Sequence, residues 1–270
     1  MKSRAVAAGV LGLALAALLV AACAKPATGR VRVVATTTLI STIINEVAPG
    51  RFAVTTIATA GLCPGQFDIR PSDMNAVNQA QLLLNHGWET WFPDLEKGIA
   101  PPGPRKVTLQ TKGDWMVPDI QKQATDELAA LLAEVDAPHA DSFRARAARY
   151  KTRVDSVAAI LKARFAADSL PAVIASDKQA PFLVWLGFPV VATYGRAEDF
   201  TARELTRLAR VALDKQVKLV VDNLQSGPET GLEFAKSVGA GHVTLTSFPS
   251  EAGYAAAVTA NADSLLAHLK

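Results

Sequence analysis

The chain has 270 residues, half of them hydrophobic, and a formal net charge of +3. This length is enough for one large domain or two smaller lobes, each with a buried core. Without Lys2 and Arg4, which lie in an N-terminal segment that we expect to be removed, 26 basic residues face 25 acidic ones and the charge is near +1. Such a balance carries no electrostatic footprint for nucleic acid, so no nucleic-acid partner is expected.

Residues 1–22 have the three-part pattern of a secretory signal peptide. A basic MKSR precedes the apolar AVAAGVLGLALAALLV, and VAAC places small residues directly before Cys23. A cysteine after two alanines is typical of a bacterial lipoprotein signal. We therefore expect cleavage before Cys23, lipidation of its thiol, and an extracytoplasmic protein anchored to the membrane of the cell envelope. A membrane-spanning helix is the alternative, but the apolar run is somewhat short for one.

The next part of the chain alternates short β-branched runs with helical patterns. Residues 23–30 have no apolar period and are expected to form a tether. Strands are predicted at 31–37, 52–59, 81–85 and 105–110, and helices at 39–48, 73–80 and 119–135.

Residues 140–167 contain neither glycine nor proline, and their apolar side chains recur every three or four positions. This spacing predicts one helix of about 28 residues, or ~40 Å. It is either an ordinary long surface helix or, within a linking segment at 137–169, a rigid connection between two lobes. The apolar positions are Phe143, Ala147, Tyr150, Val154, Ala158, Leu161 and Phe165.

The same alternation resumes after this helix. Strands are predicted at 172–176, 189–194, 217–223 and 242–247, and helices at 180–187, 202–215, 229–238 and 254–269. The pattern predicts an α/β fold class with two lobes, 31–136 and 170–270, each a mostly parallel sheet covered by helices. Ligands of such sheets bind at the carboxyl ends of the strands, so we expect a binding cleft between the lobes.

Several segments now occur together: the lipoprotein signal, VVATTTLISTIINEVAPGRFAVTTI, a loop ending in RPSDM, AQLLLNHGWE, and the long helix. In combination they resemble the zinc/manganese-type (cluster A-I) solute-binding proteins of ABC importers. The resemblance covers the mature chain. It implies two α/β lobes bridged by one rigid helix, a zinc or manganese ion held between them, and delivery of that ion to an ABC permease driven by ATPase subunits. It also implies a protein that is not an enzyme, and we expect a monomer.

The histidines that ligate the metal in this family are missing together. The histidine of the loop before Pro-Ser-Asp is replaced by Gly65, and two further histidine positions hold Gly113 and Ser176. The position of a late aspartate falls near Thr246 and Ser247. The residues around these positions still match the family pattern, so the sequence leaves the identity of the ligand open.

A second group of polar residues could still hold a metal, since Zn²⁺ takes four nitrogen, sulfur or oxygen ligands and a thiolate is a strong soft ligand. Glu89 follows Gly87 by two residues, which matches a ligand position of the family. Each candidate also has an ordinary alternative: a histidine bonded to backbone, a solvated glutamate, or an aspartate that caps a helix or turn. The metal-ligand candidates are Cys63, His86, Glu89, Asp177 and Asp222.

Cys63 follows a predicted strand and precedes Pro64 and Gly65, at the expected cleft. If Cys23 carries lipid, Cys63 has no partner for an intramolecular disulfide. It is then a ligand residue or a small buried hydrophobe. A catalytic nucleophile is disfavoured, because no Cys-x-x-Cys motif or nearby base accompanies it.

Three further residues are expected to contact a ligand. Gln66 could orient a polar molecule, and Trp88 and Trp115 could form an aromatic wall, unless they only pack the lobes. The sequence thus predicts a solute-binding protein that carries a metal ion or a metal complex. A small organic ligand, an adhesin, a metallochaperone and a cysteine-dependent enzyme are the alternatives.

Overall fold

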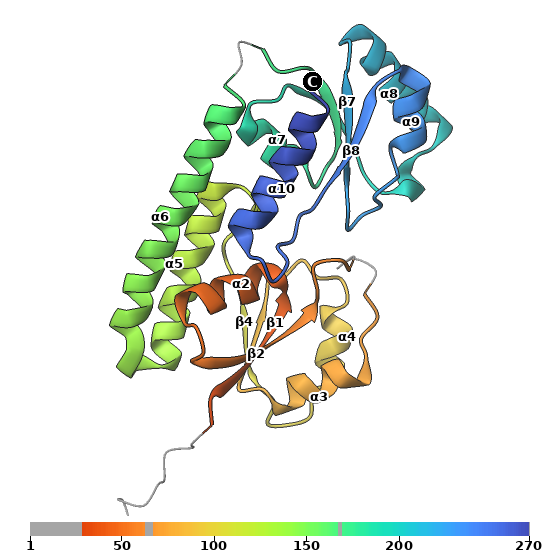
Figure 1. Cartoon of the computed structure of the whole chain (residues 1–270). Helices are drawn as coiled ribbons and strands as arrows, with labels where there is room; N and C mark the ends of the chain where they lie inside the picture. Colours follow the sequence, from red (N-terminus) through yellow and green to blue (C-terminus); the bar gives the residue numbers. More distant parts are fainter. Residues whose placement is uncertain (1–28, 63–66, 167–168, 270) are drawn as a thin grey trace, which may run out of the picture. The chain divides into compact units, whose positions relative to one another are not determined.

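Two four-stranded sheets, both entirely parallel, form the framework of the computed structural model (Figure 1). The first sheet has the order β2-β1-β3-β4 and the second the order β6-β5-β7-β8, so the two share one topology. The first sheet contains β1 (Val31–Thr37), β2 (Phe52–Ala58), β3 (Leu82–Asn85) and β4 (Arg105–Thr108). The second contains β5 (Val173–Ser176), β6 (Val190–Tyr194), β7 (Leu219–Asn223) and β8 (Gly241–Leu245).

The structure describes residues 29–62, 67–166 and 169–269. Residues 31–270 cluster into one unit, which is described by itself. The predictions for the signal peptide, Cys23, Cys63 and Gln66 lie outside the described residues. Within the described ranges, no helix is both long and apolar enough to cross a membrane.

Helices follow nearly every strand. Those of the first lobe are α2 (Thr38–Val47), α3 (Pro71–Gln79), α4 (Phe92–Lys97) and α5 (Pro118–Val135). A short 3₁₀ turn (Ala137–His139) leads into α6 (Ala140–Arg164). The second lobe contains α7 (Ala180–Leu186), a 3₁₀ turn (Ala197–Asp199), α8 (Ala202–Asp214), α9 (Leu232–Val238) and α10 (Tyr254–Ala267).

The central strands β3, β5 and β7 are buried on both faces, and so is most of β1, as expected of parallel sheets covered on both sides. Successive side chains point to opposite faces. Along β1, Val33 and Ala35 therefore join one apolar cluster with α2 and α5, whereas Val34 joins another with α3. The same split separates Leu219 and Val221 from Val220 on β7.

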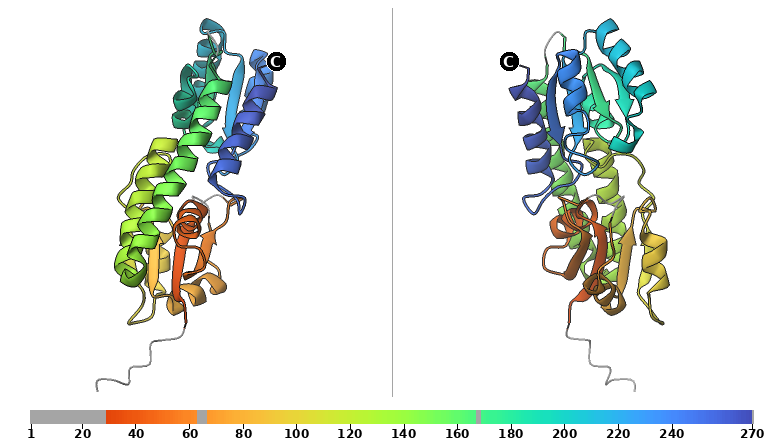
Figure 2. Two further views of the ribbon diagram at one scale, coloured as in Figure 1. Left: turned by 60° about the vertical axis from the view of Figure 1, so that its left-hand side comes forward. Right: turned by 90° about the vertical axis from the view of Figure 1, so that its right-hand side faces the viewer.

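The long helix α6 runs beside both lobes (Figures 1 and 2). Its buried side chains recur every three or four residues, and they belong to one apolar cluster that also contains residues of both sheets. The predicted fold class is therefore confirmed: two parallel α/β lobes joined by one long helix. The exact lobe boundaries, 31–136, 137–169 and 170–270, remain a prediction.

The elements differ from the prediction in small ways. The short helix α4 was not predicted, because six residues are too few to display a period. Helix α9 begins at Leu232, three residues after its predicted start, since the N–H of Gly231 bonds to Asp222 before the helix starts.

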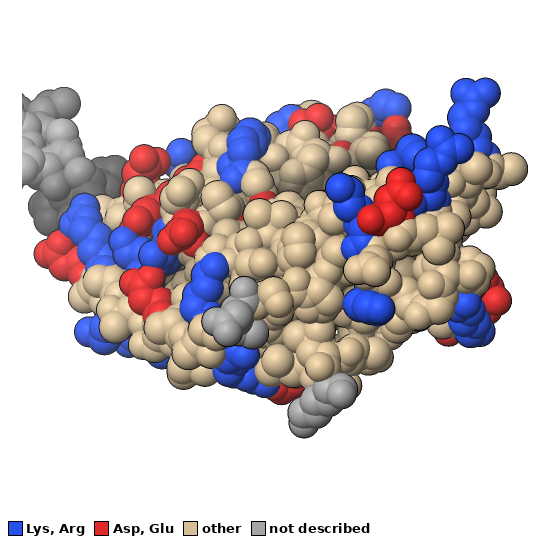
Figure 3. Space-filling view, turned by 90° about the horizontal axis from the view of Figure 1, so that it is seen from above, with Lys and Arg blue, Asp and Glu red and all other residues tan. Residues whose placement is uncertain are grey.

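Acidic and basic side chains are interspersed on the face shown in Figure 3, around a broad uncharged area.

Candidate functional site

The candidate site lies where strands of the two sheets end. In each sheet the chain order reverses at one strand, β1 in the first and β5 in the second. The carboxyl ends beside such a reversal form the usual ligand crevice of an open parallel sheet. The side chains that follow β1 and β3 in the first lobe, and β5 and β7 in the second, therefore define the site.

His86 lies at the centre of the first-lobe side. Its Nε2 is 2.8 Å from Oγ1 of Thr37, so the ends of β1 and β3 are joined by a hydrogen bond. The imidazole stacks on Trp88 with ring centroids 5.0 Å apart and meets Trp115 edge-on at 4.6 Å. Burial lowers the pKa of His86 to about 4, although the nearby Glu89 carboxylate acts in the opposite direction. His86 is therefore neutral at pH 7, the form in which imidazole binds metals.

Glu89 is buried, and its carboxylate holds together the loop that carries it. Oε1 accepts hydrogen bonds from Oγ1 of Thr36 at 2.5 Å and from the N–H of His86 at 2.9 Å. Oε2 accepts from the N–H groups of His86 and Trp88, both at 3.1 Å. Glu89 thus lies beside His86, but its oxygens are already hydrogen-bonded.

The two tryptophans differ in exposure. Trp115 is buried, and its Nε1 donates to the carbonyl of Thr111 at 3.3 Å. Trp88 is 49% exposed, and its ring lies 6.4 Å from that of Phe248 in the second lobe. Only Trp88 therefore offers an aromatic surface to a ligand in this conformation.

On the second-lobe side of the site, amides and hydroxyls form a hydrogen-bonded network. Nε2 of Gln179 donates to Oγ of Ser247 at 3.0 Å, and Asn223 donates to the same oxygen at 2.5 Å. Oε1 of Gln225 accepts from the N–H of Ser247 at 3.0 Å. Ser247, near the position of the family's late aspartate, is thereby the centre of a neutral network.

Direct contacts join the two lobes beside this network. Nε2 of Gln225 donates to the carbonyl of Ala60 at 2.6 Å, across the boundary between the lobes. The hydroxyl of Tyr254, at the start of α10, donates to the carbonyl of Met116 at 2.8 Å. The described conformation is therefore one in which the lobes touch.

The two aspartates predicted as ligands lie in different surroundings. Asp222 is fully buried and accepts hydrogen bonds from the hydroxyl of Tyr194 at 2.5 Å and from Nε2 of His242 at 2.6 Å. The N–H of Gly231 adds a third donor at 2.9 Å. Asp177 is half-exposed and pairs with the neighbouring Lys178 at 2.9 Å. It does not cap α7, which has no side-chain cap.

Of the predicted site residues, the structure thus brings together His86, Trp88, Glu89 and Trp115. In the part of the chain that the structure describes, no three His, Cys, Asp or Glu side chains are grouped so that they could hold one metal ion. A complete ligand set would need a donor from elsewhere, and Cys63 is the candidate that the sequence supplies.

Sequence reasoning did not select Gln179, Gln225 or Phe248 as site residues. All three follow strands within the segments where the strand-end rule places ligands. That rule could have indicated these residues. However, an amide or an aromatic ring in a loop does not by itself distinguish a ligand-binding residue from any other loop residue.

Two parallel lobes, one long connecting helix and polar side chains at facing strand ends define a solute-binding protein of the type with a rigid linking helix. A family model described as "Zinc-uptake complex component A periplasmic" (ZnuA) matches residues 33–268. The chain therefore belongs to this family. No curated protein sequence matches it.

Solved structures show the same fold at low sequence identity. A crystal structure of ZnuA is 16% identical, with a TM-score of 0.74 over 88% of this chain and 98% of the other. A manganese-bound mutant of a periplasmic metal-binding protein from Candidatus Liberibacter asiaticus is 15% identical, with a TM-score of 0.77 over 89% and 100%. The laminin-binding protein Lmb of Streptococcus agalactiae, described as a bifunctional adhesin and metal transporter, is 19% identical, with a TM-score of 0.74 over 89% and 100%.

Proposed function

We propose that this protein is an extracytoplasmic, lipid-anchored solute-binding protein of an ABC importer. It captures a divalent metal ion, or a complex of one, between its lobes and delivers it to a membrane permease with its ATPase. The family match over residues 33–268 is the observation that carries this proposal. It involves no chemical step, so we expect no catalytic activity.

In this proposal Cys63 is the leading metal ligand. A thiolate would supply the negative charge and soft donor that the missing histidines no longer provide. His86 is neutral and packs between Trp88 and Trp115, and is the second choice. For Glu89 or Asp222 to bind the ion, each would have to give up hydrogen bonds that now satisfy a buried carboxylate, which is costly. Asp177 has the freedom to move, since it is half-exposed.

Isothermal titration of the mature chain with Zn²⁺, Mn²⁺, Co²⁺ and Ni²⁺ tests the metal proposal. We expect one ion to bind with one-to-one stoichiometry, and Cys63→Ser to weaken it by about tenfold or more. Asp263→Asn, a substitution on exposed α10 surface, is the matched control. If no ion binds to the wild-type chain, the metal role is wrong; if Cys63→Ser binds normally, Cys63 is not a ligand.

A second candidate is a metal complex or small organic molecule that rests against the tryptophans. The half-exposed ring of Trp88, stacked on His86 and 6.4 Å from the ring of Phe248 in the second lobe, favours it. Titration with Zn²⁺ alone and with Zn²⁺ bound to free histidine separates the two candidates. A Trp88→Ala variant that loses affinity for the complex but not for the ion would favour this one, and equal losses would exclude it.

The lipid anchor has an independent test. Mass spectrometry of the protein from its native membrane should show a mature chain that begins at an acylated Cys23. A chain that still begins at Met1, or an unmodified Cys23, would remove the anchor from the proposal without affecting the metal site.

A further inference from the structure

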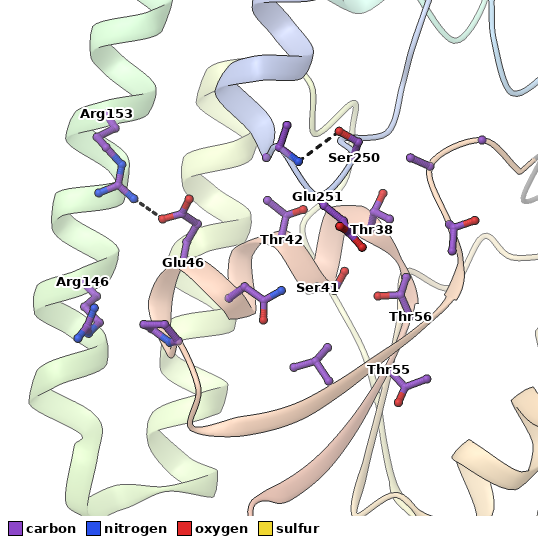
Figure 4. Close-up of a pocket in the computed structure, with 18 of the residues that line it drawn as sticks. Thr38, Ser41, Thr42, Glu46, Thr55, Thr56, Arg146, Arg153, Ser250 and Glu251 are labelled. Atoms are coloured by element: carbon purple, nitrogen blue, oxygen red, sulfur yellow. Dashed lines mark hydrogen bonds and ion pairs between the residues drawn. The ribbon is translucent and has the colours of Figure 1, made fainter.

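A groove of about 990 Å³ runs along the side of the first lobe, between α2, β2, α6 and residues 250–253 (Figure 4). None of the described candidate ligand residues lines it. Its wall is mainly polar, with many hydroxyl groups. The hydroxyl-bearing residues that line it are Thr38, Ser41, Thr42, Thr55, Thr56, Thr59 and Ser250.

The groove borders the free edge of a sheet. β2 is the outermost strand and pairs only with β1 among the described strands. Three consecutive β2 residues, Val54, Thr55 and Thr56, line the groove. Because successive side chains point to opposite faces, three in a row can border one groove only where it faces the edge of the strand. The unpaired backbone N–H and C=O groups of that edge are a template for another extended segment.

Positive charge lies along the opposite wall of the groove. Arg146, Arg149 and Arg153 project from one side of α6, three or four residues apart. Arg153 is paired with Glu46 of α2 (Figure 4). Neither Arg146 nor Arg149 forms an ion pair with a described residue, although Arg144 and Lys151 of the same helix do. The two arginines are therefore available to carboxylates of a ligand.

The acidic residues of the groove limit where a ligand can carry its charge. Glu46 is already neutralised by Arg153. In Figure 4, Glu251 lies toward the start of α2, whereas Arg146 lies toward its other end. A ligand with carboxylates beside α6 would meet Arg146 and Arg149, while carboxylates at the other end would be repelled by Glu251. The groove thus fits a ligand that is extended and acidic on the side of α6.

We propose that this groove binds an extended acidic polypeptide segment, which adds as a strand to the free edge of β2. Its backbone pairs with that edge, as in other cases of strand addition. Its carboxylates bind Arg146 and Arg149, since arginine forms charge-assisted, often bidentate hydrogen bonds with carboxylates. This groove is separate from the candidate metal site. It would give the protein a polypeptide partner in addition to the permease.

Fluorescence anisotropy with a labelled heptapeptide of alternating glutamate and valine tests this proposal, because seven residues match the length of β2. The wild-type protein should bind it in low-salt buffer. A double Arg146→Glu, Arg149→Glu variant should bind about tenfold more weakly or worse. Arg144→Glu is the matched control: Arg144 lies on the same helix but does not line the groove, so its affinity should stay within about twofold.

A second probe separates strand pairing from simple charge attraction. The same heptapeptide with alternate amides N-methylated keeps its carboxylates but loses the N–H groups that a strand needs. Thermal melting confirms that each variant is folded. We expect the methylated peptide to bind at least about tenfold more weakly, since it loses several hydrogen bonds. Equal binding of both peptides, undiminished binding by the double variant, or no binding by the wild type would each overturn the proposal.

Discussion

The two lobes share one sheet topology but place different chemistry at the ends of their strands. In the first lobe, the carboxylate of Glu89 closes its own loop beside His86 and the half-exposed Trp88. In the second, the carboxylate of Asp222 points away from the site and joins β6, β8 and the start of α9. The same backbone plan therefore leaves a titratable, aromatic surface in one lobe and a neutral amide surface in the other.

This difference shows that strand position alone does not define a ligand residue. Asp222 points to the face covered by α8 and α9, as Val220 does two residues earlier. Successive side chains of a strand point to opposite faces of the sheet, so a shift of one residue places a side chain on the other face. The neighbouring Asn223 belongs to the network around Ser247.

The largest expected effect comes from Asp222, if it is a structural carboxylate. Asp222→Ala would leave the buried hydroxyl of Tyr194 and the ring of His242 without their acceptor. The free energy of unfolding should fall by about 3 kcal/mol. Urea denaturation measures this. Asp177→Ala, at the same end of the sheet but half-exposed, should change it by less than about 0.5 kcal/mol. Equal effects of both variants would contradict the contrast between the two aspartates.

A smaller effect is expected for Glu89, because its loop also carries the half-exposed Trp88 and water can reach part of it. Glu89→Gln keeps an acceptor oxygen but loses charge-assisted hydrogen bonds, and should cost about 1–2 kcal/mol. The measurement is again urea denaturation, paired with metal titration. A variant with unchanged stability but no metal binding would show that Glu89 is a ligand and not a loop staple.

The third prediction concerns how the stability of the protein depends on pH through two groups of the first lobe. The pKa of His86 is about 4 in the folded protein, below its ordinary 6.5, so the unfolded chain binds more protons between these values. Stability contributed by neutral His86 is therefore lost as the pH falls from about 6.5 to 4. Desolvation raises the pKa of Asp114, in a nearby loop, to about 6. Asp114 acts oppositely, because the folded state binds its proton more readily.

These two titrations partly cancel, and single variants should separate them. His86→Gln should flatten or reverse the loss of stability between pH 6.5 and 4, whereas Asp114→Asn should make it steeper. Urea denaturation at pH 7, 5.5 and 4.5 provides the measurement, with His268→Gln at an exposed site as control. An unchanged pH profile in His86→Gln would mean that His86 is not protected from protonation.

The smallest effect is expected at the contact between the lobes. Gln225→Ala removes the hydrogen bond to Ala60 and the acceptor for the N–H of Ser247. It should cost about 1 kcal/mol and speed hydrogen exchange of the Ser247 amide. Gln123→Ala, on the exposed face of α5, is the control. Exchange as slow as in the wild type would show that other contacts hold this network.

Much of the fold could be predicted because its signals are local. Two β-branched runs, which end at Thr37 and Asn223, each predict a strand from their own residues alone. The stretch without glycine or proline from Ala140 predicts the long helix in the same way. Membership in a family of metal-binding solute-binding proteins was also predicted from local segments such as RPSDM. The start of α9 could not be placed, because the buried Asp222 holds the N–H of Gly231 outside the helix.

The candidate site was predictable only in part. His86, Trp88 and Glu89 are close together in the chain, and a strand end brings such neighbours together in space. Other hydrogen bonds of the site join distant residues: Thr36 is 53 positions from Glu89, and Ala60 is 165 positions from Gln225. No pattern in a single segment reports such pairings, since they depend on how the strands are ordered.

By itself, the sequence determined the α/β class, the long linking helix and the family membership, because residue types and short periods within single segments indicate each of them. Only the tertiary structure decided which carboxylates are already satisfied and which tryptophan stays exposed. It also decided that one groove is lined by an edge strand and by two arginines without an ion-pair partner among the described residues. Hydrogen bonding and burial depend on residues that the fold brings together from far apart in the chain. Local propensity does not determine which distant residues meet, whereas the packing of the two sheets and the long helix does.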